Sequence, residues 1–503
     1  MGCAVQLRNP FMFKSFAFKI YLIALILRIF PVFAAHGLGI GLDDMFQYDM
    51  LARSLAQGHG FRWYAEADLA QLAPFVNFDL STAREYDPIL GIRTSFRAPL
   101  YPAFLAIVYF INGIDASRFF AARLAQAILL GAPLAPLTYW TAKKLFLLSS
   151  FYFEAKDERE KAAEKTARIS AWLIAAYPLL LVYPLGLGTE NLFFILLLAS
   201  FLLLLSSLED PSVLHFLLSG IFLALVVLTR SVVLVFALAV FCLLIYAHGR
   251  RAILAALAFF FLVAPWIVRN SLLHGKLTGI ETSMGYNLYL GYHPQGNGSF
   301  VFGPSLDLLP ILDDAERNKV GTEKAIEFIK AQPERFIPLA VSRLGFFFGL
   351  EKRALAYFYG NDLLGFIPLP LLLTIVAILL LPFVIISISA ALGLSLLRWN
   401  LRTCLLALLF VLYIFPHIFI LAEDRFHLAL VPYFAILSAL FWTNGFKALS
   451  DRWNEARSGK ILIILSILCA VFLAANWGSE LIRDWDKIIQ LLGPNGNQSY
   501  FPY

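Results

Sequence analysis

Two adjacent carboxylates, Asp43 and Asp44, lie between the first long apolar run of the sequence and a short segment with helical spacing that ends at Gly58. An aspartate at the start of a helix usually accepts hydrogen bonds from free backbone N–H groups. Neighbouring carboxylates that are partly buried also raise one another's pKa, which favours a catalytic base. Carboxylate oxygens bind divalent metals as well. The pattern therefore leaves three interpretations of this pair open, namely a helix cap, a catalytic base and a metal site.

Arginine residues stand at the ends of apolar stretches further along the chain. Arg97 directly precedes the apolar stretch 98–112, Arg230 interrupts a long apolar sequence, and Arg269 follows a Pro-Trp pair. A guanidinium binds phosphate through paired hydrogen bonds. A single basic residue at such a position is equally compatible with an anchor to lipid headgroups. The arginines therefore indicate either phosphate binding or membrane anchoring.

Other polar residues also lie where apolar runs begin or end. Ionisable groups at membrane depth are costly and usually face a cavity instead of lipid. Each of them alone is more often structural, but together they predict one cavity for an anionic, membrane-borne ligand. The further candidates for that cavity are Tyr48, Glu190, Arg230, Arg425 and His427.

The elements that position these residues follow from composition. Of the 503 residues, 60% are hydrophobic and 15% are charged, against about 45–50% and about 25% in soluble globular proteins. This excludes a soluble enzyme, a disordered chain and a nucleic-acid-binding module, and predicts an all-α polytopic membrane protein. A spanning helix needs about 20 mostly apolar residues. Eleven stretches qualify, near 15–36, 118–147, 168–186, 190–208, 212–229, 231–248, 251–268, 367–396, 403–421, 427–446 and 460–477.

Lys and Arg in the short connections predict the orientation, because cytoplasmic connections carry an excess of them. An N-terminus inside places every basic cluster, such as 143–168 and 447–460, on the inner side. Two long loops, about 37–117 and 269–366, then lie outside and carry juxtamembrane helices. One of these is expected at 98–112, which is too short to span. All the candidate site residues fall on this outer side.

Four segments in this order resemble the GT-C superfamily of integral-membrane glycosyltransferases, particularly bacterial relatives of protein O-mannosyltransferases and lipid A aminoarabinose transferases. They are Asp44 with Tyr48 and the following Gly58-His59-Gly60, the run Arg97-Ala98-Pro99-Leu100-Tyr101-Pro102, Glu190 opening a span, and Pro265-Trp266-Ile267-Val268-Arg269-Asn270. The resemblance covers about 40–280, and the C-terminal part matches only in layout. Met45 stands where the family often has Glu, and only a short tail follows the last span.

The resemblance implies a polyprenyl-phosphate-linked sugar as donor and transfer from C1, with inversion, to an acceptor hydroxyl on the outer face. Asp44 would be the general base, and Arg97 and Arg269 would stabilise the departing phosphate. Asp43 would orient its neighbour or help Asp44 to hold a divalent metal, although the sequence does not establish that any cofactor is required. The partners would be a glycan, lipid or protein acceptor and the lipid bilayer, with no nucleic acid. The expected location is a bacterial inner membrane with the site facing the periplasm.

This interpretation divides the chain into a catalytic membrane module at 1–280, an outer loop with amphipathic helices at 281–366, C-terminal spans at 367–477 and a short outer tail at 478–503. Two alternatives remain open from the sequence. The first is a transporter or flippase of a lipid-linked anion, although its site would be expected near the membrane midplane. The second is an outer-face oligosaccharide polymerase or ligase.

Overall fold

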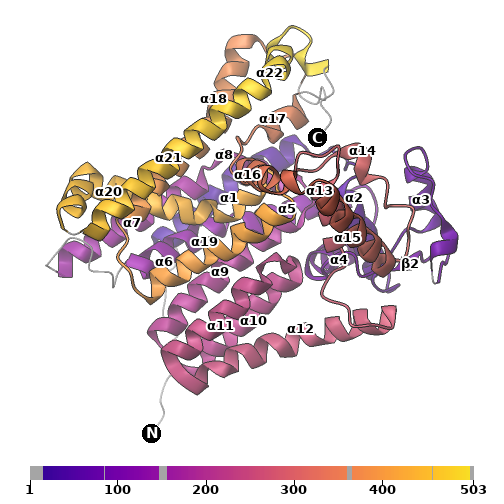
Figure 1. Cartoon of the computed structure of the whole chain (residues 1–503), viewed down its shortest axis with the longest axis horizontal. Helices are drawn as coiled ribbons and strands as arrows, with labels where there is room; N and C mark the ends of the chain where they lie inside the picture. Colours follow the sequence, from indigo (N-terminus) through magenta and orange to yellow (C-terminus); the bar gives the residue numbers. More distant parts are fainter. Residues whose placement is uncertain (1–14, 84, 147–155, 360–364, 456, 499–503) are drawn as a thin grey trace.

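The computed structural model describes residues 15–83, 85–146, 156–359, 365–455 and 457–498, and this part of the chain is overwhelmingly helical (Figure 1). Its one regular sheet pairs two short antiparallel strands, β1 (Arg62–Trp63) and β2 (Ile92–Arg93). The predicted all-α polytopic membrane fold is therefore confirmed.

All eleven predicted spans are helical, but the count of helices able to cross a membrane differs from eleven. Among the described residues, eight helices are long and apolar enough, or nine if the bent pair Asp157–Ala175 and Pro178–Leu185 forms one span. One of the eight, Ser231–His274, contains two predicted spans, α11 (Leu234–His248) and α12 (Ile253–His274), because Gly249 has a φ of 65° and ends α11. The helices at the other predicted positions are α1 (Phe16–Ala34), the continuous helix Arg118–Phe146, α7 (Lys156–Ala175), α8 (Pro178–Val182), α9 (Thr189–Glu209), α10 (Val213–Thr229), α18 (Leu369–Ser395), α19 (Leu401–Phe419), α20 (Val431–Glu455) and α21 (Arg457–Arg483), of which α10 is shorter than a full span.

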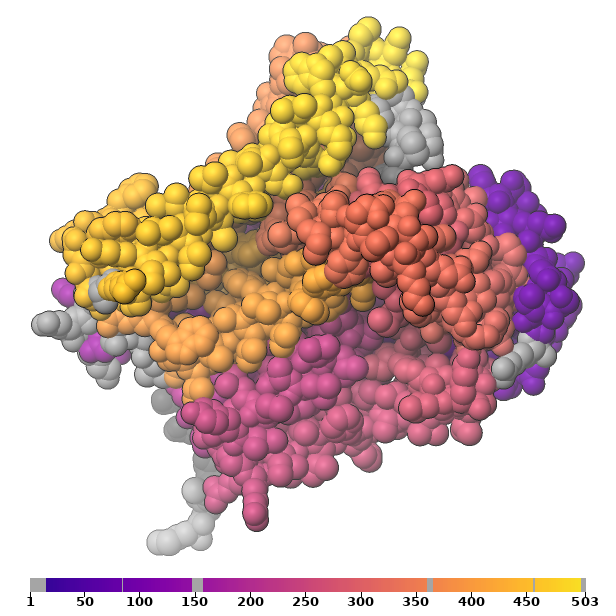
Figure 2. All heavy atoms as spheres, viewed as in Figure 1, coloured from indigo at the N-terminus to yellow at the C-terminus, as the bar shows by residue number. Residues whose placement is uncertain are grey.

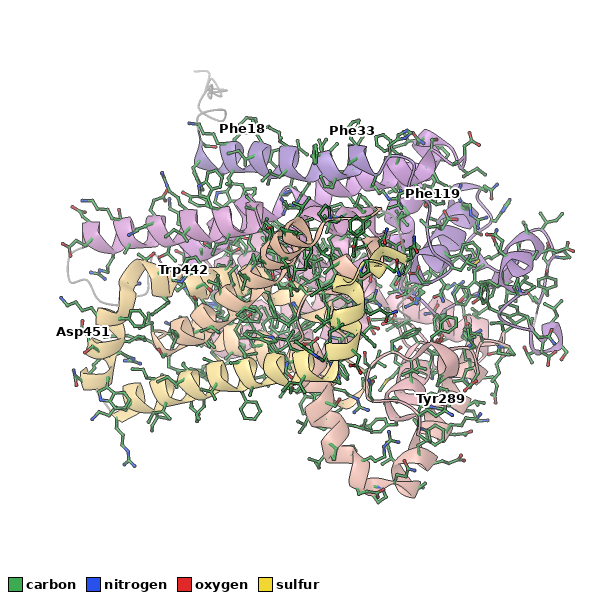
Figure 3. All side chains as sticks on the ribbon, turned by 90° about the horizontal axis from the view of Figure 1, so that it is seen from above. Phe18, Phe33, Phe119, Tyr289, Trp442 and Asp451 are labelled. Carbon is green, nitrogen blue, oxygen red and sulfur yellow. The ribbon has the colours of Figure 1, made fainter. Side chains whose placement is uncertain are left out.

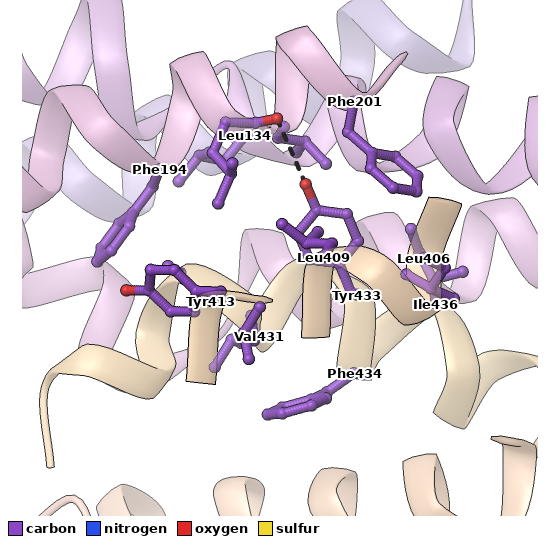
Figure 4. Packing of buried hydrophobic residues seen from close by; sticks show 14 of the residues in the cluster. Leu134, Phe194, Phe201, Leu406, Leu409, Tyr413, Val431, Tyr433, Phe434 and Ile436 are labelled. Carbon is purple, nitrogen blue, oxygen red and sulfur yellow. Dashed lines mark hydrogen bonds between the residues drawn. The ribbon is translucent and has the colours of Figure 1, made fainter. Parts of the chain in front are cut away.

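Close helix packing in the core depends on residues without a side chain. A Cβ at Gly220 of α10 would lie 2.1 Å from the carbonyl oxygen of Ala255 in α12, so the two helices touch backbone to backbone. Such contacts are common between membrane helices, because van der Waals packing holds them together. Aromatic and aliphatic side chains of α9, α19 and α20 fill the centre (Figure 4). The N-terminal end of α18 and the C-terminal end of α21, together with α22 (Trp485–Leu492), project beyond the rest of the molecule (Figure 2).

The two long loops form one folded unit. The hydroxyl of Thr94 and the backbone N–H of Ser95, both in the first loop, donate to the Asp314 carboxylate of the second loop at 2.5 and 2.8 Å. Ser95 also bonds His274, the last residue of α12, at 2.7 Å. The helices of this unit are α2 (Asp44–Ala56), α3 (Glu66–Leu72), α4 (Leu100–Asn112), α13 (Met284–Tyr292), α14 (Phe302–Ser305), α15 (Asp314–Ala331), α16 (Phe336–Phe347) and α17 (Arg353–Phe358). The loops therefore hold one another at the ends of the spans.

The basic connections gather at the other end of the bundle. Lys144 pairs with Glu209 at 2.9 Å and accepts a hydrogen bond from Arg402 on its backbone carbonyl at 3.4 Å. Figure 3 shows Asp451 at this end and Tyr289, from the second loop, at the opposite one. The predicted separation of short basic turns from long loops is thus present in the fold.

Reporter fusions test the orientation. A reporter fused after Gly60 should be exported, whereas one fused after Lys165 should stay in the cytoplasm, because short basic connections are retained inside. Reporter activity in intact cells measures both. Equal activity at the two positions would contradict the topology.

Candidate active site

A cavity of about 1280 Å³ lies between the two loops and the adjoining ends of the spans. One part of its wall is charged and comes from both long loops and from the turns between spans. Another part is apolar and continues along the spans α11 and α12, where it includes Leu234, Val235, Leu238, Phe259, Phe260, Val263 and Ile267. Val235 and Phe260 are half exposed on these helices, so the cavity is open along this side.

The N-terminus of α2 places the two aspartates in different roles. The Asp43 carboxylate accepts a hydrogen bond from the backbone N–H of Met45 at 2.8 Å and caps the helix. Asp44 lies in the first turn and pairs with Arg97 through one oxygen and with Arg425 through the other, the latter at 3.1 Å. The cap interpretation therefore holds for Asp43, and Asp44 has its carboxylate between two guanidinium groups.

Arg97 is held in place by α2 itself. Its Nε and Nη2 atoms donate to the Gln47 amide oxygen at 2.9 and 2.7 Å. Its guanidinium also lies over the ring of Tyr48, 5.3 Å from the centroid. Tyr48 in turn packs edge-on against Tyr101 of α4 at 5.1 Å. The packing of α2 on α4 thus fixes the position of Arg97 beside Asp44.

Arg425 connects Asp44 to acidic residues from two other turns. It lies 2.9 Å from the Glu423 carboxylate and 3.6 Å from that of Glu190. Glu190 also pairs with Arg230 at 2.9 Å. We call this set, completed by Arg353 and its partners, the arginine–carboxylate network, and it comprises Asp44, Arg97, Glu190, Arg230, Arg353, Glu423, Asp424 and Arg425.

The pKa values of the two aspartates move in opposite directions. Burial alone would raise the pKa of the Asp44 carboxyl, but Arg97 and Arg425 outweigh burial and hold this pKa well below its ordinary value. Burial raises the pKa of Asp43, and the negative charge of Asp44 adds to that rise. Asp44 is therefore ionised at physiological pH, and between its two arginines it is a weak proton acceptor.

Arg269 lies outside the cavity, which differs from the expectation that it binds phosphate. Its Nη1 donates to the backbone carbonyl of Thr94 at 2.5 Å and to the Asn270 side chain at 2.9 Å. The guanidinium also lies over the Trp266 ring at 4.9 Å. These contacts attach the first loop to α12, so the geometry favours a structural role for Arg269. Phosphate binding by Arg269 stays a prediction, and the structure does not support it.

His427 is fully buried and does not itself line the cavity, but it contacts Glu351, which does. Its Nε2 lies 3.0 Å from the Glu351 carboxylate and its Nδ1 lies 2.8 Å from the Phe347 carbonyl oxygen. Tyr177 donates to the same Glu351 oxygen at 2.5 Å. Burial raises the pKa of Glu351, which lines the cavity. The sequence offered no pattern for Glu351, because its partners lie 174 and 76 residues away.

Arg123 is a second residue that the sequence did not single out. It is fully buried, lines the cavity and donates to the backbone carbonyls of Leu38, Gly39 and Leu185. A buried guanidinium without a carboxylate needs such carbonyls in place of water. Leu38 and Gly39 belong to the segment that leads into Asp43, so Arg123 positions the start of α2.

The residues present do not fit the proposed metal site at Asp43 and Asp44. Within the described part of the chain, no group of three or more His, Cys, Asp or Glu side chains is placed to hold a metal ion. Both oxygens of Asp44 face arginines, and one oxygen of Asp43 caps α2. The two aspartates are therefore engaged by arginines and by the backbone instead of being free to bind a metal.

No protein-family model matches the sequence, and no curated protein matches it. Among the solved structures that match, the crystal structure of ArnT from Cupriavidus metallidurans bound to undecaprenyl phosphate is 14% identical to this chain. The match covers 88% of this chain and 79% of that one, with a TM-score of 0.36. ArnT is a member of the GT-C superfamily that the sequence motifs resemble. At this identity and TM-score, the similarity does not assign an activity to this chain.

Proposed function

We propose that this protein is a membrane glycosyltransferase that moves a sugar from a polyprenyl-phosphate donor to an acceptor hydroxyl, with Asp44 as the general base. One observation carries the proposal. A carboxylate held between Arg97 and Arg425 lies in a cavity that continues along the apolar, open faces of α11 and α12. Such a cavity accommodates a ligand that is anionic at one end and lipid at the other. The four sequence segments that resemble the GT-C superfamily support the same assignment.

The proposed reaction is a single displacement at C1 of the sugar. The acceptor oxygen forms a bond to C1 from the face opposite the phosphate, and its proton passes to Asp44. The bond from C1 to the phosphate oxygen breaks, and its electron pair leaves with the polyprenyl phosphate. Arg97 and Arg425 stabilise the negative charge that develops there. Attack from the opposite face inverts the configuration at C1.

We place this reaction on the outer face of a bacterial inner membrane. The long loops carry the charged part of the cavity, and the basic turns gather at the other end of the bundle. If short basic turns are cytoplasmic, the cavity faces the periplasm. The acceptor is then a glycan, lipid or protein that is accessible from that side.

A transfer assay tests the proposal. The purified protein, reconstituted in liposomes, is given a panel of polyprenyl-phosphate sugars together with membranes from a strain that lacks it as the source of acceptor. We expect release of free polyprenyl phosphate with one donor, and loss of that release in Asp44→Asn. Movement of the intact lipid across the bilayer without loss of sugar would instead indicate a flippase.

A second prediction concerns Arg123 as a positioning residue. Arg123→Ala should lower kcat about ten- to a hundred-fold without changing donor KM, because the segment leading into Asp43 loses its anchor and small misplacements are costly. Arg123→Lys should restore part of this rate. Steady-state kinetics on both variants provide the measurement.

Arg28 is the matched control for Arg123. It is also fully buried and donates to backbone carbonyls, those of Ile174 and Ala175 at 2.9 and 3.1 Å, but it does not line the cavity. Arg28→Ala should lower thermal stability and leave kcat per folded molecule unchanged. Equal kcat losses in the two alanine variants would assign Arg123 a purely structural role.

A further inference from the structure

In the described part of the chain, the charged part of the cavity offers a phosphate no accessible cation that lacks a carboxylate partner. Among the described residues that line the cavity, five are arginines, none is a lysine and seven are acidic. Four of the arginines are paired with carboxylates of the arginine–carboxylate network. The fifth, Arg123, donates to backbone carbonyls. Arg123 keeps its positive charge, but it is fully buried and donates to these carbonyls. An incoming anion therefore meets accessible arginines that carboxylates already neutralise.

Adding a negative charge to a balanced, partly buried network is unfavourable unless another anion leaves it. The carboxylates of this network differ in how easily they could leave. The side chains of Glu190 and Glu423 are 6% and 5% exposed, whereas that of Asp44 is 34% exposed. Asp44 also lies on a loop helix next to the open cavity, so its release into water costs the least.

The geometry around Asp44 also matches a phosphate. One carboxylate oxygen faces Arg97 and the other faces Arg425, so the two guanidinium groups converge on a pair of anionic oxygens. A phosphate presents a similar pair of oxygens, and arginine binds both groups in the same manner. The Gln47 amide oxygen keeps Arg97 in this orientation independently of Asp44.

We propose that Asp44 occupies the place of the donor phosphate between Arg97 and Arg425, and that the donor phosphate displaces it. This inference rests on the proposed function. Displacement has a chemical consequence, because Asp44 loses the two cations that make it a weak proton acceptor. Donor binding thus converts an inactive carboxylate into a general base, and the acceptor hydroxyl is activated only when a donor is present.

Binding of a polyprenyl phosphate without sugar tests the exchange directly. Its dissociation constant is measured in detergent micelles for the wild-type protein, Asp44→Asn and Asp44→Ala. If Asp44 competes with the phosphate, both variants should bind about ten- to a hundred-fold tighter than wild type, the usual range for one charge-assisted contact. The alanine variant provides a second measurement if the asparagine amide still bonds the two arginines, or if the asparagine variant does not fold.

Asp43→Asn is the matched control, because it removes a neighbouring negative charge that makes no ion pair with either arginine. It should tighten binding by a few-fold at most, through long-range electrostatics alone. Measurable binding with no gain in either Asp44 variant, or an equal gain in Asp43→Asn, would overturn the exchange and leave the proposed function standing. No binding of the lipid to any of the four proteins would overturn both.

Discussion

Asp44→Asn should lower the rate of sugar transfer by at least about a hundred-fold, within the range that general-base catalysis usually contributes. Asparagine has nearly the same shape as aspartate and still fits the first turn of α2, but it cannot accept the proton of the acceptor hydroxyl. Fold and membrane insertion should be retained, since Asp43 provides the helix cap. Single-turnover kinetics with saturating donor measure the chemical step apart from binding.

Asp43→Asn provides the comparison on the same helix, and it should cost much less rate because an asparagine also caps helices well. A rate for Asp44→Asn within a few-fold of wild type would refute the base assignment. A large loss at Asp43 with a small one at Asp44 would move the base by one residue. The raised pKa of Asp43 would then have a catalytic explanation.

Arg97→Ala and Arg425→Ala should each weaken binding of polyprenyl phosphate by about ten- to a hundred-fold. Each variant removes a charge-assisted contact to the phosphate and leaves Asp44 with one cation fewer, so repulsion of the phosphate increases. Arg97→Lys should recover only part of the loss, because a point charge replaces a planar fork. Titration of the lipid against each purified variant measures this affinity.

Arg269→Ala is the control for these two substitutions. Its guanidinium contacts the Thr94 carbonyl and the Trp266 ring outside the cavity, so the variant should lose thermal stability and keep its affinity for the lipid. Weakened lipid binding in Arg269→Ala, with unchanged affinity in Arg97→Ala and Arg425→Ala, would return the phosphate site to Arg269.

The sequence predicts the helices well, because each span must be apolar over a length that the bilayer dictates. It predicts the number of spans less well. The 17 residues of α10 fall short of a full span, and α11 and α12 are separated only by a turn at Gly249. The sequence places Asp44 and Arg97 in one long loop and in two of the segments that resemble the GT-C superfamily, but their direct pairing across 53 residues depends on how that loop folds.

Other features of the site depend on packing between distant parts of the chain. Arg425 is 381 residues from Asp44, and no local pattern indicates that they touch. Arg269 has a side chain of the type that binds phosphate, but its hydrogen bond to the Thr94 carbonyl, 175 residues away, could not be predicted from the sequence. The type of a residue therefore indicates which interactions it can make, whereas its hydrogen-bond partners in the fold determine whether it acts in the cavity or elsewhere.

The open apolar wall along α11 and α12 has a consequence for the choice of lipid carrier. On the proposed function, half-exposed residues such as Val235 and Phe260 would contact the part of the isoprenoid chain that enters the cavity, and the rest of that chain would lie among the membrane lipids. Such a protein would recognise the phosphate end of its lipid carrier, and its affinity would not depend on the length of the lipid chain. On the proposed function, isoprenoid carriers of different lengths serve equally well, and discrimination among donors depends on the sugar.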